Sequence, residues 1–189
     1  MRWAPGAVAI GVVAILSSCG DPTAPPDQGF SITVTGDVSD AIDGMGAVFD
    51  EVSVTSTADG VWTIDLSVGE PGSVEGVAFL FNGPRPAAGT YDLADASGGV
   101  PDAGRFFAAV TVIVEQPTPA SFLGTSTTGT LTITESSGDV VRGEFSFEAD
   151  GVLFRPTGNT DGVVTVEGTF VAASGEIDLD PPGGPVIVP

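Results

Sequence analysis

The sequence predicts an all-β protein, an antiparallel β-sandwich of about eight to ten strands. Two features of the chain predict this fold. From Phe30 onward, apolar and polar residues alternate with a period of two, so that successive side chains point to opposite faces of a strand. Short turn signals rich in glycine, asparagine and aspartate separate these segments, as they do in a meander of hairpins. The alternative is an up-and-down barrel.

We expect half-buried strands over residues 30–35, 62–68 and 130–134. In each segment, β-branched, leucine or aromatic side chains occupy one face, and mostly threonine, serine or aspartate occupies the other. Side chains of the first kind fit a pleated surface that is covered on one side. One face of each strand is therefore expected to lie in the core.

Two further segments, residues 77–81 and 106–114, are apolar on nearly every position. Strands of this kind are covered on both sides, so we expect them in the middle of a sheet or sandwich. Only residues 38–45 have a pattern that fits a short helix, and Gly44 and Gly46 disfavour it.

The pattern Val-x-Gly-x-Phe occurs at residues 141–145 and again at residues 166–170. Its valine, glycine and phenylalanine point to the same face of a strand, and the glycine leaves room for a large ring from the neighbouring strand. We therefore predict that the two strands pair, with Phe145 or Phe170 covering the opposite glycine. Residues 74–79 resemble a third copy, but their glycine and phenylalanine fall on opposite faces.

The N-terminus has the pattern of a lipoprotein signal peptide, residues 1–18. Arg2 supplies a positive charge, and an apolar run over residues 7–16 follows it. This run is too short to span a bilayer, which needs roughly 20 apolar residues. The sequence Leu16-Ser17-Ser18-Cys19 then resembles the bacterial lipobox. Cleavage there makes Cys19, the only cysteine, the lipid-attached N-terminus, and several acyl chains hold a protein firmly on a membrane.

Three segments make up the mature chain. Residues 19–29 are rich in proline and are expected to form an extended tether. Residues 30–180 are expected to form a single β-sandwich domain, and residues 181–189 a tail rich in proline and glycine. Gly20, and not aspartate, follows the lipobox. By resemblance to the sorting of enterobacterial lipoproteins, this residue favours the outer membrane as the location. It does not indicate whether the protein faces the periplasm or the cell surface.

Residues 129–134, 141–147 and 164–170 resemble the C-terminal half of small uncharacterised lipoprotein domains from environmental Gram-negative bacteria. In that family, a strand with a Gly-Thr-x-x-Ile-Thr start precedes two Gly-x-Phe strands, and residues 89–93 fit its middle portion. The resemblance covers about half of the mature chain. It implies an antiparallel β-sandwich and a lipidated N-terminus, and it implies no activity.

The chain is strongly acidic, with 25 aspartate and glutamate residues against five arginines and no lysine. Loss of the signal peptide removes Arg2 and leaves four arginines against 25 acids, a net charge of −21. Nucleic acid and anionic lipid headgroups are repelled by such a chain, so we expect no nucleic-acid partner. Contact with the membrane is expected through the N-terminal lipid. The sequence does not indicate whether a further partner is a protein, a glycan or a cation.

Few side chains in this sequence suit catalysis or transition-metal binding. There is no histidine and no lysine, and the sole cysteine is the expected site of lipid attachment. A serine nucleophile lacks its usual base here, and zinc lacks its preferred ligands. We therefore expect a protein that is not an enzyme and that has no cofactor and no metal. Calcium is the one cation for which the acidic loops at residues 37–44, 92–102 and 159–161 offer oxygen ligands.

The function expected from these observations is that of a membrane-anchored lipoprotein, acting as a binding, adhesion or envelope-structural module. One alternative is a carboxylate-dependent glycosidase. Glu176, Asp178 and Asp180 resemble the first part of the Glu-x-Asp-x-x-Glu motif of β-jelly-roll glycosidases, although no second glutamate follows. Another alternative is a lipocalin-like barrel that holds an apolar ligand.

Overall fold

The structure, a computed structural model, describes residues 28–52, 61–70, 73–95, 102–115 and 119–175. These residues form ten strands and no helix, which confirms the all-β class and the expected number of strands. In chain order the strands are β1 (Gly29–Gly36), β2 (Asp40–Gly44), β3 (Val48–Val52), β4 (Val61–Glu70), β5 (Ser73–Asn82), β6 (Gly89–Asp92), β7 (Phe106–Val114), β8 (Ala120–Ser137), β9 (Val140–Phe154) and β10 (Thr160–Ser174).

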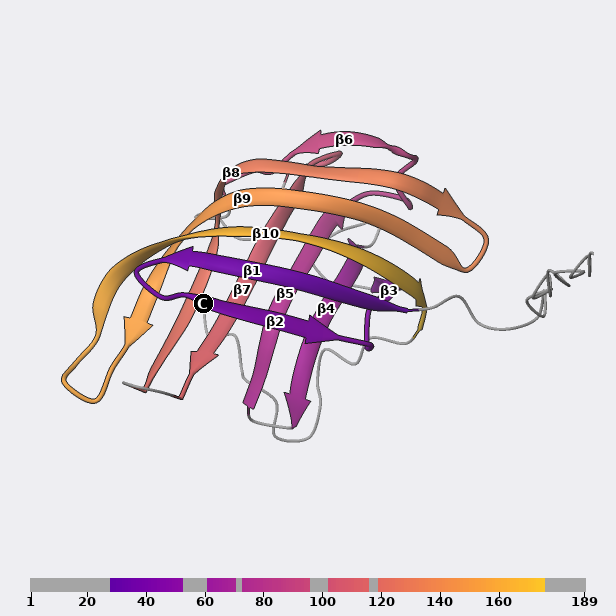
Figure 1. Ribbon diagram of the computed structural model, residues 1–189. Coiled ribbons are helices and arrows are strands. Elements are labelled where there is room, and N and C mark those ends of the chain that lie inside the picture. Colours follow the sequence, from indigo (N-terminus) through magenta and orange to yellow (C-terminus); the bar gives the residue numbers. More distant parts are fainter. Residues whose placement is uncertain (1–27, 53–60, 71–72, 96–101, 116–118, 176–189) are drawn as a thin grey trace, which may run out of the picture.

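The strands form two layers that pack face to face and cross at a steep angle (Figure 1). In the front layer, β2, β1, β10, β9 and β8 lie side by side, and β6 pairs with β8 at the edge. The back layer contains β3, β4, β5 and β7. These strands all pair in antiparallel fashion except β10 and β3, which form a short parallel pair. The arrangement is the sandwich that the alternating pattern predicts.

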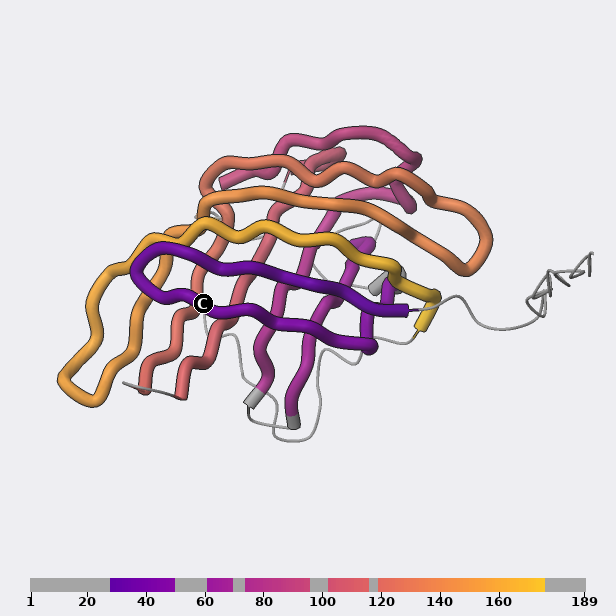
Figure 2. The backbone as a smooth tube through the Cα atoms, in the orientation of Figure 1, coloured from indigo at the N-terminus to yellow at the C-terminus, as the bar shows by residue number. Residues whose placement is uncertain are grey.

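The three longest strands belong to both layers. β8, β9 and β10 curve as they cross the molecule, which the backbone trace in Figure 2 shows. The first part of β8 pairs with β7, and the end of β10 pairs with β3, so hydrogen bonding continues from one layer into the other. Two register shifts in β8, at Ser126/Thr128 and Ile133/Glu135, supply bends of the kind that such a strand needs.

Apolar side chains fill the space between the layers. Trp62, Phe79, Phe106 and Phe122 are the largest fully buried side chains among them. The ring of Phe79 on β5 reaches the front layer, where its centroid lies 4.9 Å from that of Phe145. The strand pairing also runs in a closed ring from β10 through β3, β4, β5, β7, β8 and β9 back to β10, so the barrel that holds an apolar ligand stays a prediction.

The Val-x-Gly-x-Phe strands pair as predicted. They are parts of β9 and β10, and their register places Gly168 opposite Phe145 and Gly143 opposite Phe170. A methyl group added to either glycine meets the opposite ring, so each ring covers the glycine beside it. Both rings also pack on Phe79, with centroid distances of 4.9 Å and 6.5 Å. The motif therefore joins two strands of the front layer and connects them to the back layer.

Residues 38–45, the one segment whose pattern fits a short helix, form no helix, in keeping with the two glycines that disfavour it. The chain forms the edge strand β2 here, paired with β1. Ile42 lies opposite Ile32, and both side chains are buried in the core. Burial of this apolar side chain in a period-two arrangement outweighs a weak local helix preference.

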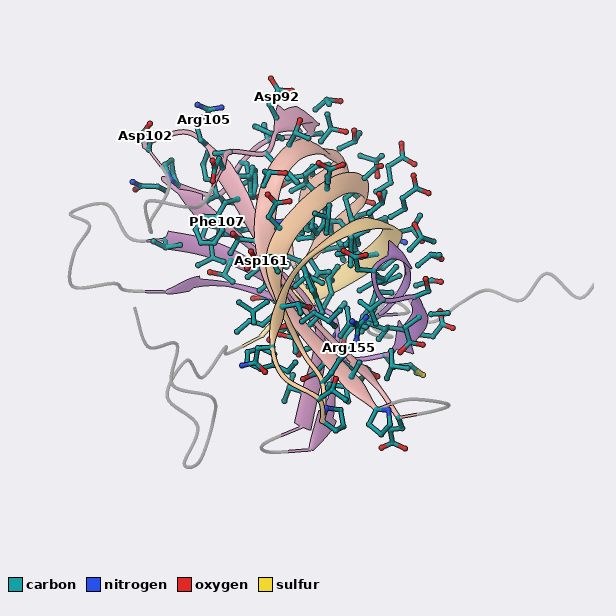
Figure 3. The ribbon with its side chains drawn as sticks, turned by 90° about the vertical axis from the view of Figure 1, so that its left-hand side faces the viewer. Asp92, Asp102, Arg105, Phe107, Arg155 and Asp161 are labelled. Atoms are coloured by element: carbon teal, nitrogen blue, oxygen red, sulfur yellow. The ribbon has the colours of Figure 1, made fainter. Side chains whose placement is uncertain are left out.

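The two apolar segments lie in the middle of the back layer, as predicted. Residues 77–81 belong to β5 and residues 106–114 form β7, and the two strands pair with each other. Their inward side chains are buried, whereas the outward ones, such as Leu80 and Phe107, are half-buried. Figure 3 labels Phe107 on this outer side.

A buried serine joins β8 to β7 and to the segment that follows β6, at the point where β7 and β8 separate. The side chain of Ser126 is fully buried. Its Oγ accepts a hydrogen bond from the Ala108 N–H at 3.0 Å and donates one to the Ala94 carbonyl at 2.9 Å. The β7–β8 ladder ends at Ala109 and Thr125, so these bonds pair backbone groups just beyond its end.

Arg85, in the connection between β5 and β6, holds the turn between β8 and β9. Its guanidinium donates to Ser136 Oγ at 3.0 Å, to the Gly138 carbonyl at 2.6 Å and to the Val140 carbonyl at 2.9 Å. It also lies over the Phe49 ring of β3, 4.6 Å from the centroid. One side chain thus connects three separate parts of the chain.

Candidate functional site

The candidate site is an open groove on the outer face of the front layer, with a volume of about 440 Å³. Hydroxyl and carboxylate side chains from four adjacent strands make up nearly all of its lining. They are Ser31 and Thr33 of β1, Thr130 and Thr132 of β8, Glu144 and Ser146 of β9, and Glu167 and Thr169 of β10. Phe145 and Gly168 complete the lining.

Alternation along each strand explains why polar side chains gather here. In β9, Phe145 and Phe147 are buried in the core, so Glu144 and Ser146 between them point outward. The same relation holds on the three other strands, where an isoleucine, leucine, valine or phenylalanine fills the core beside each outward hydroxyl or carboxylate. Burial of the inner face therefore determines the polar set on the outer face.

Strand register orders these residues into two rows that cross the groove. The first row is Thr132, Glu144, Thr169 and Ser31, and the second is Thr130, Ser146, Glu167 and Thr33. Glu144 and Glu167 are diagonal neighbours on the two central strands, β9 and β10. The Cα atoms of such neighbours lie roughly 7–8 Å apart, so the two carboxylates share the middle of the groove.

The groove is negatively charged. Its two glutamates are exposed, and none of its lining residues is basic. The Ser146 hydroxyl donates to Glu167 Oε1 at 3.2 Å. In the part of the chain that the structure describes, the one salt bridge joins Arg142 to Glu135, neither of which lines the groove. The groove therefore favours cations and hydrogen-bond donors.

A carboxyl with a perturbed pKa lies elsewhere, on the outer side of β4 in the back layer. Burial raises the pKa of Asp65, and a hydrogen bond from Ser67 partly opposes that rise. Nearby on the same side of the strand, Thr63 is buried, and its hydroxyl has no hydrogen-bond partner among the described residues. Within those residues, no group of three or more acidic, histidine or cysteine side chains could hold a metal ion.

In the acidic segment at residues 37–44, two carboxylates accept hydrogen bonds from backbone N–H groups. Asp37 Oδ2 accepts a hydrogen bond from the Val163 N–H at 2.9 Å, and Asp40 Oδ1 accepts one from the next N–H in the chain at 2.8 Å. Asp43 is exposed on the outer face of β2. The structure thus gives the first two carboxylates a role in the hairpin and at its contact with β10. The loop at residues 92–102 is described only in part.

Several predicted functional residues lie outside the described residues. They are Cys19, the expected lipid-attachment site, and Glu176, Asp178 and Asp180 of the glycosidase-like pattern. Lipidation and the glycosidase alternative therefore both stay predictions. Among the residues that are described, no helix is long and apolar enough to cross a membrane.

The sequence pattern did not point to Glu144 and Glu167 as groove residues. Both lie inside the Val-x-Gly-x-Phe segments, which drew attention to their inward residues only. The signal that could have found them is the outward half of the same alternation, once the two strands are paired. The contribution of β1 was not accessible in this way, because its position beside β10 depends on the whole fold.

Comparisons of this chain with protein-family models, with curated proteins and with solved structures give no match. The resemblance to small lipoprotein domains is not tested by them and stays a prediction. The function is therefore inferred from the chemistry of the groove and of the N-terminus.

Proposed function

We propose that this protein is a membrane-anchored lipoprotein that is not an enzyme and serves as a binding module of the cell envelope. In this proposal Cys19 carries the lipid, and the groove of the front layer is the binding surface. The groove itself carries the proposal, because hydroxyls and carboxylates from four strands face solvent together there. A surface of this composition offers one ligand many hydrogen-bond donors and acceptors.

The rigidity of the groove supports a binding role. In the region of the groove, β1 lies between β2 and β10, β9 lies between β8 and β10, and β8 lies between β9 and β6. Side chains on such paired strands need little reorganisation to meet a ligand. The entropic cost of binding is correspondingly low.

The chemistry of the groove supports recognition and not nucleophilic catalysis. Its hydroxyls have no histidine beside them, since the chain contains none. The nearest arrangement to a nucleophile and a base is Ser146, whose hydroxyl donates to Glu167. An exposed carboxylate is a weak base for a serine hydroxyl.

The tether supports presentation of this surface at a membrane. Gly29, where β1 begins, follows Cys19 by ten residues. An extended proline-rich segment of this length spans about 31 Å. The domain would then stay close to the membrane. Gly20 after the lipobox supports the outer membrane as that location.

Metabolic labelling with a tagged fatty acid tests the anchor. We expect label on the wild-type protein and none on Cys19→Ser. If the signal peptide is still removed from this variant, it should also be found in the soluble fraction and no longer in the membrane fraction. Mass spectrometry of the N-terminal peptide identifies the acylated residue. A labelled Cys19→Ser protein, or a wild-type N-terminus without acyl chains, would refute lipidation at this position.

A glycan and peptide array tests the binding role of the groove. The double variant Thr132→Val/Thr169→Val removes two hydroxyls of the same row, and Thr165→Val removes one from β10 outside the groove. We expect the double variant to bind roughly tenfold more weakly and Thr165→Val to bind like the wild type. Equal losses in both variants would refute the groove as the binding surface. Cleavage of a bound glycan would refute the non-enzymatic role.

A further inference from the structure

We infer that the groove selects an oligosaccharide whose sugars carry free amino groups. The ammonium groups would meet Glu144 and Glu167, and the ring hydroxyls would meet the serine and threonine hydroxyls around them. This inference rests on the proposed binding function and names the ligand class of the same groove.

Charge is the first reason. Glu144 and Glu167 share the middle of the groove, and no basic residue lines it. The whole chain has a net charge of −20, so the surrounding field has the same sign. Sugars with carboxylate or sulfate groups are repelled by such a surface, whereas an ammonium group is attracted to it.

The hydroxyl lining is the second reason. Six of the eight polar side chains in the two rows are serine or threonine. A hydroxyl both donates and accepts hydrogen bonds, which matches the hydroxyls of a sugar. A simple polyamine has no hydroxyl groups and would leave these six side chains hydrogen-bonded to water.

The closed edges of the strands are the third reason. A peptide that binds to a sheet by strand addition needs an unpaired strand edge. The strands that line the groove are each paired on both sides in this region. A basic peptide could therefore reach the groove only through its side chains, without the backbone bonds that give such complexes their affinity.

The length of the rows favours an oligomer over a single sugar. Each row crosses four strands, or three gaps of about 4.8 Å, which is roughly 14 Å. This is longer than one sugar ring. Glu144 lies in one row and Glu167 in the other, on the two central strands, so amines on adjacent sugars of a chain that crosses the groove would come near both carboxylates.

Isothermal titration calorimetry on the mature protein, extracted from membranes in a non-ionic detergent, tests the inference. The ligands are a glucosamine hexamer, its fully N-acetylated counterpart and hexalysine. A mildly acidic buffer keeps the sugar amines protonated. The variants are Glu144→Gln/Glu167→Gln and, as a control of the exposed acidic surface, Asp161→Asn on β10 outside the groove (Figure 3).

We expect the glucosamine hexamer to bind best. Loss of each carboxylate should weaken its binding up to about fivefold, and the double variant about tenfold or more. Asp161→Asn should stay within about twofold of the wild type. Higher salt should weaken binding of the glucosamine hexamer and leave the acetylated hexamer unaffected.

Equal affinity for the glucosamine and acetylated hexamers would overturn selection of amines, while the array result for the hydroxyl variants would still support a binding groove. Binding of hexalysine as tight as that of the glucosamine hexamer would overturn selection of a sugar. An equal loss of binding in Asp161→Asn would overturn a role for the two groove carboxylates. Absence of binding to all three ligands would overturn the amino-sugar inference, and the array then decides the binding function separately.

Discussion

Replacing Gly168 by alanine tests whether the reciprocal glycine and phenylalanine pairs determine the packing of β9 on β10. Alanine adds one methyl group on the inner side of β10. There it would lie 2.5 Å from the carbonyl oxygen of Ser31 and 2.6 Å from Cζ of Phe145. Both distances are shorter than any normal contact, so a ring or a strand must move.

The cost of that movement follows from what surrounds the ring. Phe145 is buried, and its centroid lies 4.9 Å from that of Phe79, 5.9 Å from that of Phe147 and 6.4 Å from that of Phe170. Overpacking a filled core costs about 1–3 kcal/mol, and displacing the β1 backbone places this substitution near the upper end, at about 2–3 kcal/mol. For a domain of this size, the midpoint of thermal unfolding should fall by about 4–12 °C.

Urea and thermal unfolding of the mature protein measure the effect. Fluorescence of Trp62 reports on it, because this buried residue is the only tryptophan left after the signal peptide is removed. Gly89→Ala is the matched control, since it is also a strand glycine but its added methyl group has 3.8 Å of clearance from the Tyr91 ring. We expect the control to change the free energy of unfolding by less than about 0.5 kcal/mol.

A double-mutant cycle identifies the ring as the cause. Leucine in place of Phe145 has no Cζ atom, so Gly168→Ala should cost about 1 kcal/mol less in the Phe145→Leu background. If Gly168→Ala were no more destabilising than Gly89→Ala, or if the two substitutions were additive, the packing account would be refuted.

Three further predictions concern polar groups. Ser126→Ala leaves a buried backbone N–H and a half-buried carbonyl without their hydrogen bonds, so urea unfolding should show a loss of about 2 kcal/mol in the free energy of unfolding. A loss below about 0.5 kcal/mol would contradict its joining role. Arg85→Lys cannot keep all three hydrogen bonds and the contact with Phe49, so we expect a loss of about 1–2 kcal/mol and faster hydrogen exchange in the β8–β9 turn. Unchanged exchange there would show that the turn does not depend on the guanidinium. Burial raises the folded-state pKa of Asp65. The contribution of this group to the free energy of unfolding is therefore greatest below the ordinary aspartate pKa and falls as the pH rises through the raised value. Asp65→Asn should therefore stabilise the protein at neutral pH and lose this advantage in acid, and a benefit equal at all pH values would contradict the assignment.

The sequence by itself determined the fold class and one exact strand pairing. Period-two alternation is a local property, because it depends only on which face of a strand is buried. The Val-x-Gly-x-Phe pattern also specified register, since a glycine on the core side needs an opposite ring and only one alignment of residues 141–145 with 166–170 supplies two. Lipidation at Cys19 is a further prediction of the sequence, still to be measured.

Only the tertiary structure decided where the polar faces meet. Asp40–Gly44 form a strand because Ile42 is buried opposite Ile32, a contact that local propensity does not encode. The groove likewise needs β1, from the start of the domain, to lie beside β10 at its end. Its carboxylates become neighbours through the pairing of β9 with β10. Two of the strands that supply its hydroxyls, β1 and β10, lie more than a hundred residues apart in the chain. Side chains that face solvent contribute little to strand order, so the core residues behind them determine which polar residues share the surface.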